Sequence, residues 1–104
     1  MTNEYGTELD RNGYAPSILN VGQMCMICQR TNRHLQRHEV FHGANRAKSK
    51  SYGLWVNLCM ECHNNVHSYP TLDKGLKRDA QRHAMLVYKW TKDDFRKRFG
   101  KNYI

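Results

Sequence analysis

Four cysteines, arranged as two Cys-x-x-Cys pairs, are the residues of this sequence best suited to bind a metal. The pairs are Cys25 with Cys28 and Cys59 with Cys62. Four thiolates can surround one Zn2+ ion as a tetrahedron, and such a closed site leaves no coordination position for a reactant. The alternatives are buried free thiols or a redox-active pair, which would need only one Cys-x-x-Cys. We therefore predict a structural zinc site whose binding free energy contributes to folding.

Three of the six histidines have a spacing that could create a second metal site. His63 and His67 are four residues apart, so a helix would place both imidazoles on one face. His38 lies upstream of a loop, and a hairpin over that loop would bring it against the same helix. Three imidazoles could hold a catalytic divalent ion, such as Mg2+ or Mn2+, and leave positions open for phosphate and water. The alternative is that these histidines are solvated side chains of a basic protein.

A short hairpin followed by a helix is expected to position both sets of residues. Apolar and β-branched residues predict strands over residues 38–41 and 54–58, joined by a flexible basic loop over residues 42–53. The second Cys-x-x-Cys then opens a helix that carries two of the histidines and ends at Pro70.

Two more helices are predicted in the C-terminal part of the chain. The first is amphipathic and capped by Thr71 or Asp73. The second runs from Asp93 to Phe99, begins at a cap on Thr91 and ends at Gly100. The apolar face of the first helix is expected to consist of Leu72, Leu76, Ala80, His83, Val87 and Trp90.

The 104 residues are expected to form a single α+β domain. We predict a flexible N-terminal arm at residues 1–21, disordered in part or draped over the core. A zinc-stapled core at residues 22–70 and a helical extension at residues 71–104, packed on that core, complete the domain. The sequence shows neither a signal peptide nor an apolar stretch of membrane-spanning length, so we expect a cytoplasmic protein with reduced thiols and no membrane partner.

The charge of the chain favours a polyanionic partner. Its net charge is +8, from 17 Lys and Arg against 9 Asp and Glu, and nucleic acid is the usual partner of so basic a domain. Arg46, Lys48 and Lys50 of the predicted loop are expected to contact DNA phosphates beside the histidines. Arg46 is the best candidate for the scissile phosphate, because its planar guanidinium suits two oxygens.

The segment from Cys25 to about His67 resembles the HNH endonuclease family. The stretches His-Glu-Val-Phe-His-Gly-Ala-Asn-Arg and Tyr-Gly-Leu-Trp-Val-Asn-Leu-Cys-Met-Glu-Cys-His, and the ending Phe-Gly-Lys-Asn-Tyr-Ile, are similar to small HNH proteins of bacteriophages. The resemblance covers roughly residues 22 to 104. It implies a ββα-metal hairpin and helix inside a treble-clef-like zinc scaffold. It also implies a phage-encoded protein in a bacterial cell, with partners in DNA packaging or recombination.

The family activity implied is the metal-dependent hydrolysis of DNA phosphodiester bonds, by nicking or double-strand cutting and with low sequence specificity. His63 and His67 match the helix residues that bind the catalytic metal, and His63 is among the residues we expect to be catalytic. His38 matches the metal-binding residue of the first strand. Glu39 stands where the family has its general base, which is normally a histidine.

The roles of the remaining catalytic groups stay open. His38 and Glu39 are expected to be the essential pair, with either as the base, and His42 is a further candidate. The family also uses an asparagine between the strands to orient the base, and Asn45 and Asn57 are the nearest candidates here.

Two other kinds of protein fit part of this pattern. A non-catalytic zinc-finger module that binds nucleic acid would use the same cysteines and charges, but it has no need of three converging histidines. A redox or metal-handling protein is disfavoured by the basic charge. The sequence does not indicate an oligomeric state.

Overall fold

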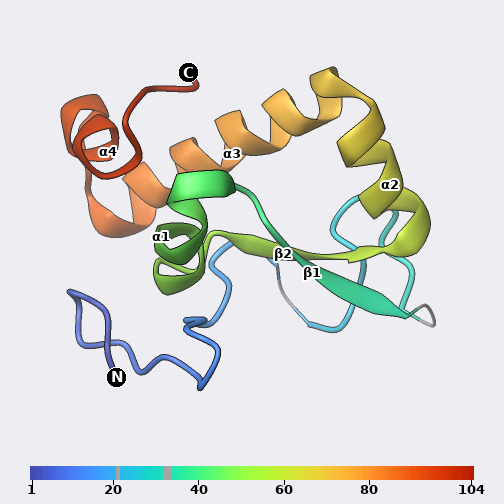
Figure 1. Cartoon of the computed structure of the whole chain (residues 1–104), viewed down its shortest axis with the longest axis horizontal. Helices are drawn as coiled ribbons and strands as arrows, with labels where there is room; N and C mark the ends of the chain where they lie inside the picture. The colour runs from blue at the N-terminus through green and yellow to red at the C-terminus, as the bar shows by residue number, and fades with distance from the viewer. Residues whose placement is uncertain (21, 32–33) are drawn as a thin grey trace.

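The computed structural model describes residues 1–20, 22–31 and 34–104; residue 21 of the predicted arm and residues 32 and 33 of the predicted core lie outside this range. The described residues form a small α+β fold with one two-stranded sheet (Figure 1). Its elements are β1 (Leu35–Glu39), the 3-10 turn η1 (Gly43–Asn45), α1 (Arg46–Ser51), β2 (Trp55–Cys59), α2 (Met60–Ser68), α3 (Pro70–Tyr88) and α4 (Lys92–Phe99).

The two strands pair antiparallel, with His38 opposite Val56 and Glu39 opposite Trp55. The first strand was predicted at residues 38–41, and the structure corrects this to Leu35–Glu39. Val40 and Phe41 follow the last residue of the strand. Both enter the core, where each is at most 1% exposed, so their apolar side chains reflect burial and not strand pairing. The second strand was predicted one residue too early, since it ends on Cys59.

The predicted flexible loop over residues 42–53 is wrong, because η1 and α1 occupy most of it. Ser49 of α1 is fully buried and closes this segment onto the hairpin. Its hydroxyl accepts a hydrogen bond from the Phe41 backbone at 3.1 Å and donates one to the Leu54 carbonyl at 2.6 Å. The basic residues of this segment suggested a solvated loop. The buried Ser49 hydroxyl instead links the segment to the backbone after the end of β1 and before β2.

Gly53 closes the turn between α1 and β2 with a φ of +71°, and a Cβ there would overlap the carbonyl oxygen of Pro16. We therefore expect Gly53→Ala to lower the free energy of unfolding by about 1–3 kcal/mol for the left-handed conformation alone. Urea unfolding followed by circular dichroism measures the change.

The matched control is Gly75→Ala, because Gly75 lies in α3 and a Cβ added there would meet no atom within 4 Å. Alanine should stabilise that helix by about 0.5–1 kcal/mol relative to glycine. Equal effects of the two substitutions would contradict the close approach at Gly53.

The described part of the arm, residues 1–20, runs below α1 in Figure 1, and its hydrogen bonds and ion pairs reach α1, β2 and α4. The backbone N–H of Ala15 donates to the Lys50 carbonyl at 3.0 Å, and the Trp55 indole donates to the Ala15 carbonyl at 2.7 Å. Nearer the N-terminus, Glu4 pairs with Arg98 at 3.0 Å. The arm thus makes polar contacts with α1, β2 and α4.

The start of α3 differs from its prediction. The helix begins at Pro70, and its N-cap Tyr69 makes no side-chain capping bond, so neither Thr71 nor Asp73 is the cap. Proline is well suited to the first helical position, because its missing N–H would have no partner there.

In the described residues, no helix is long and apolar enough to cross a membrane.

The predicted apolar face of α3 is correct in its middle and wrong toward both ends of the helix, since Leu72 is 40% exposed and the buried Trp90 lies after the helix. Ala80 and Ala84 are buried, whereas His83 is exposed and Val87 is 50% exposed. The predicted face continued from Ala80 to His83, three residues later, but the buried face continues to Ala84, four residues later. For α4 the predicted cap and end are confirmed, because Thr91 forms a capping box with Asp94 and Gly100 ends the helix in the left-handed conformation. The helix begins at Lys92, one residue earlier than predicted.

Candidate metal centres

The four cysteines meet where the hairpin runs into α2. Cys25 and Cys28 lie on the loop before β1, Cys59 ends β2, and Cys62 lies in the first turn of α2. Their sulfur atoms all lie within 4.8 Å of one another, and those of Cys28 and Cys59 are 3.8 Å apart. A tetrahedral zinc site with Zn–S bonds near 2.3 Å separates its sulfurs by about 3.8 Å. This cysteine cluster could therefore hold a metal ion such as zinc.

Backbone hydrogen bonds shape the cysteine cluster. The Gln29 N–H donates to the Cys25 carbonyl at 2.8 Å, and the Met26 N–H donates to the Asn57 carbonyl of β2 at 2.8 Å. Burial of the Cys25 thiol opposes its ionisation, but hydrogen bonds from backbone N–H groups outweigh that cost and lower its pKa to about 6. Burial raises the pKa of Cys62. The Cys25 thiol therefore ionises more readily than a free cysteine, and a bound cation would favour the thiolate form of the other three.

A second group, the histidine cluster, joins β1 to α2. It consists of His38 near the end of β1 and of His63 and His67, one turn apart in α2. The Nε2 atoms of His63 and His67 are 3.2 Å apart, and the ring of His38 lies 5.3 Å and 5.6 Å from theirs. Nitrogen ligands of a tetrahedral metal site are separated by about 3.3 Å. The structure thus brings together the three histidines that their spacing singled out.

The buried nitrogen of His38 fits a metal ligand. This side chain is only 4% exposed, and within the described residues its Nε2 has no hydrogen-bond partner. A buried polar atom without a partner costs about 1–3 kcal/mol. Burial, together with the nearby His63 and His67, lowers the pKa of His38 to about 4. The imidazole is therefore neutral at pH 7 and can offer a lone pair, and burial lowers the pKa of His63 in the same sense.

The histidine cluster lines an open hollow of about 510 Å³, which we call the central hollow. Glu39 and Arg46 also line it, and the Glu39 carboxylate accepts a hydrogen bond from the Arg46 guanidinium at 2.5 Å. Glu39 is only 8% exposed, whereas the Arg46 side chain is 62% exposed. The buried carboxylate therefore holds the guanidinium at the opening of the hollow, and Glu39 does not belong to the histidine cluster.

Several predicted site residues do not line the central hollow. The Lys48 ammonium donates to the Arg98 carbonyl at 2.6 Å, and the Lys50 ammonium donates to the Asn12 carbonyl at 3.4 Å. Asn45 donates to the Phe99 carbonyl at 3.0 Å, so it ties η1 to α4. Within the described part of the chain, Asn57 uses its backbone to contact the cysteine loop and the arm: its carbonyl accepts from Met26, and its N–H donates to the Asn20 side chain.

Two further residues line the central hollow: Arg37, which the sequence did not indicate, and His42, which the sequence offered as a candidate base. Arg37 stacks over the rings of Tyr14 and Trp55 at 4.5 Å and 4.8 Å. His42 lies at the rim, 3.8 Å from the Asp73 carboxylate of α3. These contacts come from segments distant in the chain, so no local pattern could have identified the stacking of Arg37 or the pairing of His42 with Asp73.

The chain shows no similarity that would place it in a known group: comparison with protein-family models, curated proteins and solved structures gives no match.

Proposed function

We propose that this protein is a metal-dependent endonuclease of the HNH type, which hydrolyses DNA phosphodiester bonds at the central hollow. The observation that carries the proposal is the buried Nε2 of His38, which has no hydrogen-bond partner among the described residues and lies beside two helix imidazoles. Arg37 and Arg46 line the same hollow. The cysteine cluster is the structural zinc site of this proposal. It ties the start of α2 to the loop before β1 and thereby fixes the register of the histidines.

His38, His63 and His67 are the residues that would hold the catalytic ion. When bound, a divalent ion supplies Lewis-acid stabilisation of the charge that develops on the phosphate. Arg46 binds the phosphate oxygens with a planar guanidinium that Glu39 has already oriented. Arg37 adds a second guanidinium from the hairpin side of the hollow.

His42 is the proton acceptor that we favour for the attacking water. Its side chain is 53% exposed at the rim of the hollow, where a water molecule can reach its ring, and its Nε2 lies 3.8 Å from the Asp73 carboxylate. The Glu39 carboxylate, in contrast, is engaged by Arg46. Glu39 therefore acts as a positioning residue for the guanidinium in this assignment.

A plasmid-nicking assay tests the proposal. Protein purified with its zinc and then dialysed is incubated with supercoiled DNA, with Mg2+, with Mn2+ or without added divalent ion. We expect nicked or linear product only with the added ion, because the closed cysteine site has no open position. DNA that is bound but intact with every ion would favour the zinc-finger binding module instead.

A further inference from the structure

A second basic hollow lies between α3 and the C-terminal residues 101–104. It has a volume of about 490 Å³ and is lined by Lys74, Lys77, Arg78 and Lys101, with Asp73 as its acidic residue. We call it the tail hollow. Its cations come from two segments that are distant in the chain, so it is more than the charged face of one helix.

Gln81 is the residue that builds the tail hollow. It lies in α3 with no exposed surface. Its amide donates to the Asn102 side chain at 2.8 Å and accepts from the Tyr103 backbone at 2.6 Å. Tyr103 also packs 5.1 Å from the ring of Phe41 in the core. Residues 102 and 103 are thus fixed against α3.

The cations of the tail hollow converge and are mostly uncompensated. The ammonium groups of Lys77 and Lys101 both lie over the Tyr103 ring, at 5.7 Å and 5.0 Å. Asp73 is neutralised by Lys77, whose ammonium is 2.9 Å away. Among the described residues, Lys74, Arg78 and Lys101 form no ion pair, so their charges remain available to an anion. A cleft lined by one sign of charge concentrates the opposite charge.

The tail hollow and the central hollow are neighbours on the surface, joined by residues that line a third hollow. A small hollow of about 200 Å³ lies between them, and it shares His42 and His67 with the central hollow and Asp73 with the tail hollow. A polyanion that enters the central hollow can therefore follow one surface to the cations of α3 and the tail.

We infer that the tail hollow is a second phosphate-binding subsite, which holds the backbone of the same DNA molecule away from the bond that is cut. The inference rests on the proposed function for its substrate. Contacts of this kind carry no sequence information, but they set the position of the backbone and give binding that weakens with salt.

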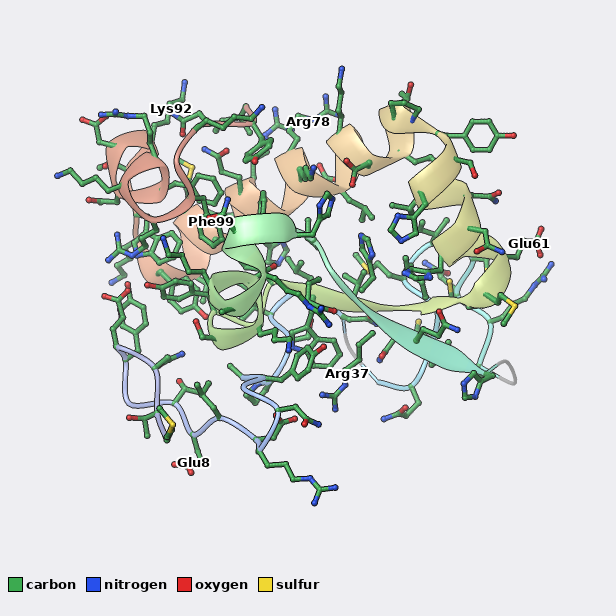
Figure 2. All side chains as sticks on the ribbon, viewed as in Figure 1. Glu8, Arg37, Glu61, Arg78, Lys92 and Phe99 are labelled. Atoms are coloured by element: carbon green, nitrogen blue, oxygen red, sulfur yellow. The ribbon has the colours of Figure 1, made fainter. Side chains whose placement is uncertain are left out.

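Charge reversal tests the subsite. Arg78→Glu/Lys101→Glu is compared with Lys92→Glu/Lys97→Glu, which reverses the same number of charges at exposed positions of α4. Figure 2 labels Arg78 on α3 and Lys92 on α4. Binding of a fluorescein-labelled duplex is followed by anisotropy over a series of NaCl concentrations, without divalent ion. Loss of two phosphate contacts should reduce the slope of log K against log salt by about two and weaken binding about 30-fold at physiological salt. The α4 variant should change the slope much less.

The outcome does not depend on cleavage. Equal slopes for the two double variants would overturn the subsite, since only net charge would then matter. An unchanged slope for Arg78→Glu/Lys101→Glu would overturn it as well and would leave an acidic protein segment as the ligand to test. If the charge-reversed variant unfolds, Arg78→Gln/Lys101→Gln replaces it in the test. This variant removes the two charges without reversing them and should lose the same two phosphate contacts. Failure of the proposed function appears separately, as wild-type protein that binds DNA and never cuts it.

Discussion

Replacement of His63 by alanine is expected to abolish metal-dependent DNA cleavage while the fold is retained. His63 is only partly buried, so its loss leaves no large cavity, in contrast to the loss of His38. Two imidazoles hold a divalent ion more weakly than three, and removal of one group that stabilises transition-state charge commonly costs about 10²–10³-fold in rate. The rate of plasmid nicking at saturating Mn2+ measures the effect.

The matched control for this prediction is His83→Ala, which removes an exposed histidine from α3 outside the central hollow. The control should cleave at the wild-type rate. Titration with Co2+, followed by its visible absorption, should show one site fewer for His63→Ala than for the control. Nicking by His63→Ala at the wild-type rate would remove the histidine cluster from the mechanism.

Replacement of Cys59 by serine is expected to unfold the domain. The apparent free energy of zinc binding to structural sites is about 10–16 kcal/mol. The total stability of a small domain is about 5–15 kcal/mol. Cys59 ends β2 directly before α2, so loss of its thiolate releases the start of the helix that carries His63 and His67. Zinc content by atomic emission and the thermal unfolding curve measure the change.

Met60→Ser is the control for the cysteine variant, because Met60 is the next residue and is 59% exposed. It should keep one bound zinc and the wild-type melting temperature. A strong chelator should unfold the wild-type protein in the same way as Cys59→Ser, and added Zn2+ should restore the fold. A Cys59→Ser protein that melts like wild type would show that the cysteines are buried thiols without a metal.

The sequence alone determined the two sets of possible metal ligands. Spacing within a Cys-x-x-Cys pair or along one helical turn is a local property, so it indicated that Cys59 and Cys62, and likewise His63 and His67, belong together. The α4 helix was predictable for the same reason, because a capping box and a terminal glycine act within a few residues of each other.

Local spacing could not predict where the strands end, that α1 forms, or which residues of the C-terminal half of α3 are buried. Val40 and Phe41 look like strand residues by composition, yet burial against distant helices takes them out of the sheet. The lysines of residues 42–53 suggested a loop, but the buried Ser49 hydroxyl hydrogen-bonds this segment to the Leu54 carbonyl. Each of these features depends on contacts between residues far apart in the chain, which a local pattern does not contain.

The same division applies to the surroundings of the candidate site. The sequence indicated that Arg46 belongs there, but only the tertiary structure paired it with Glu39, placed His42 beside Asp73 and turned Lys48 and Lys50 toward backbone carbonyls. Sequence therefore determined which ligand atoms this protein has. Tertiary packing decided which of its charges face one another, because the direction of a long side chain follows from the neighbours that the whole fold brings to it.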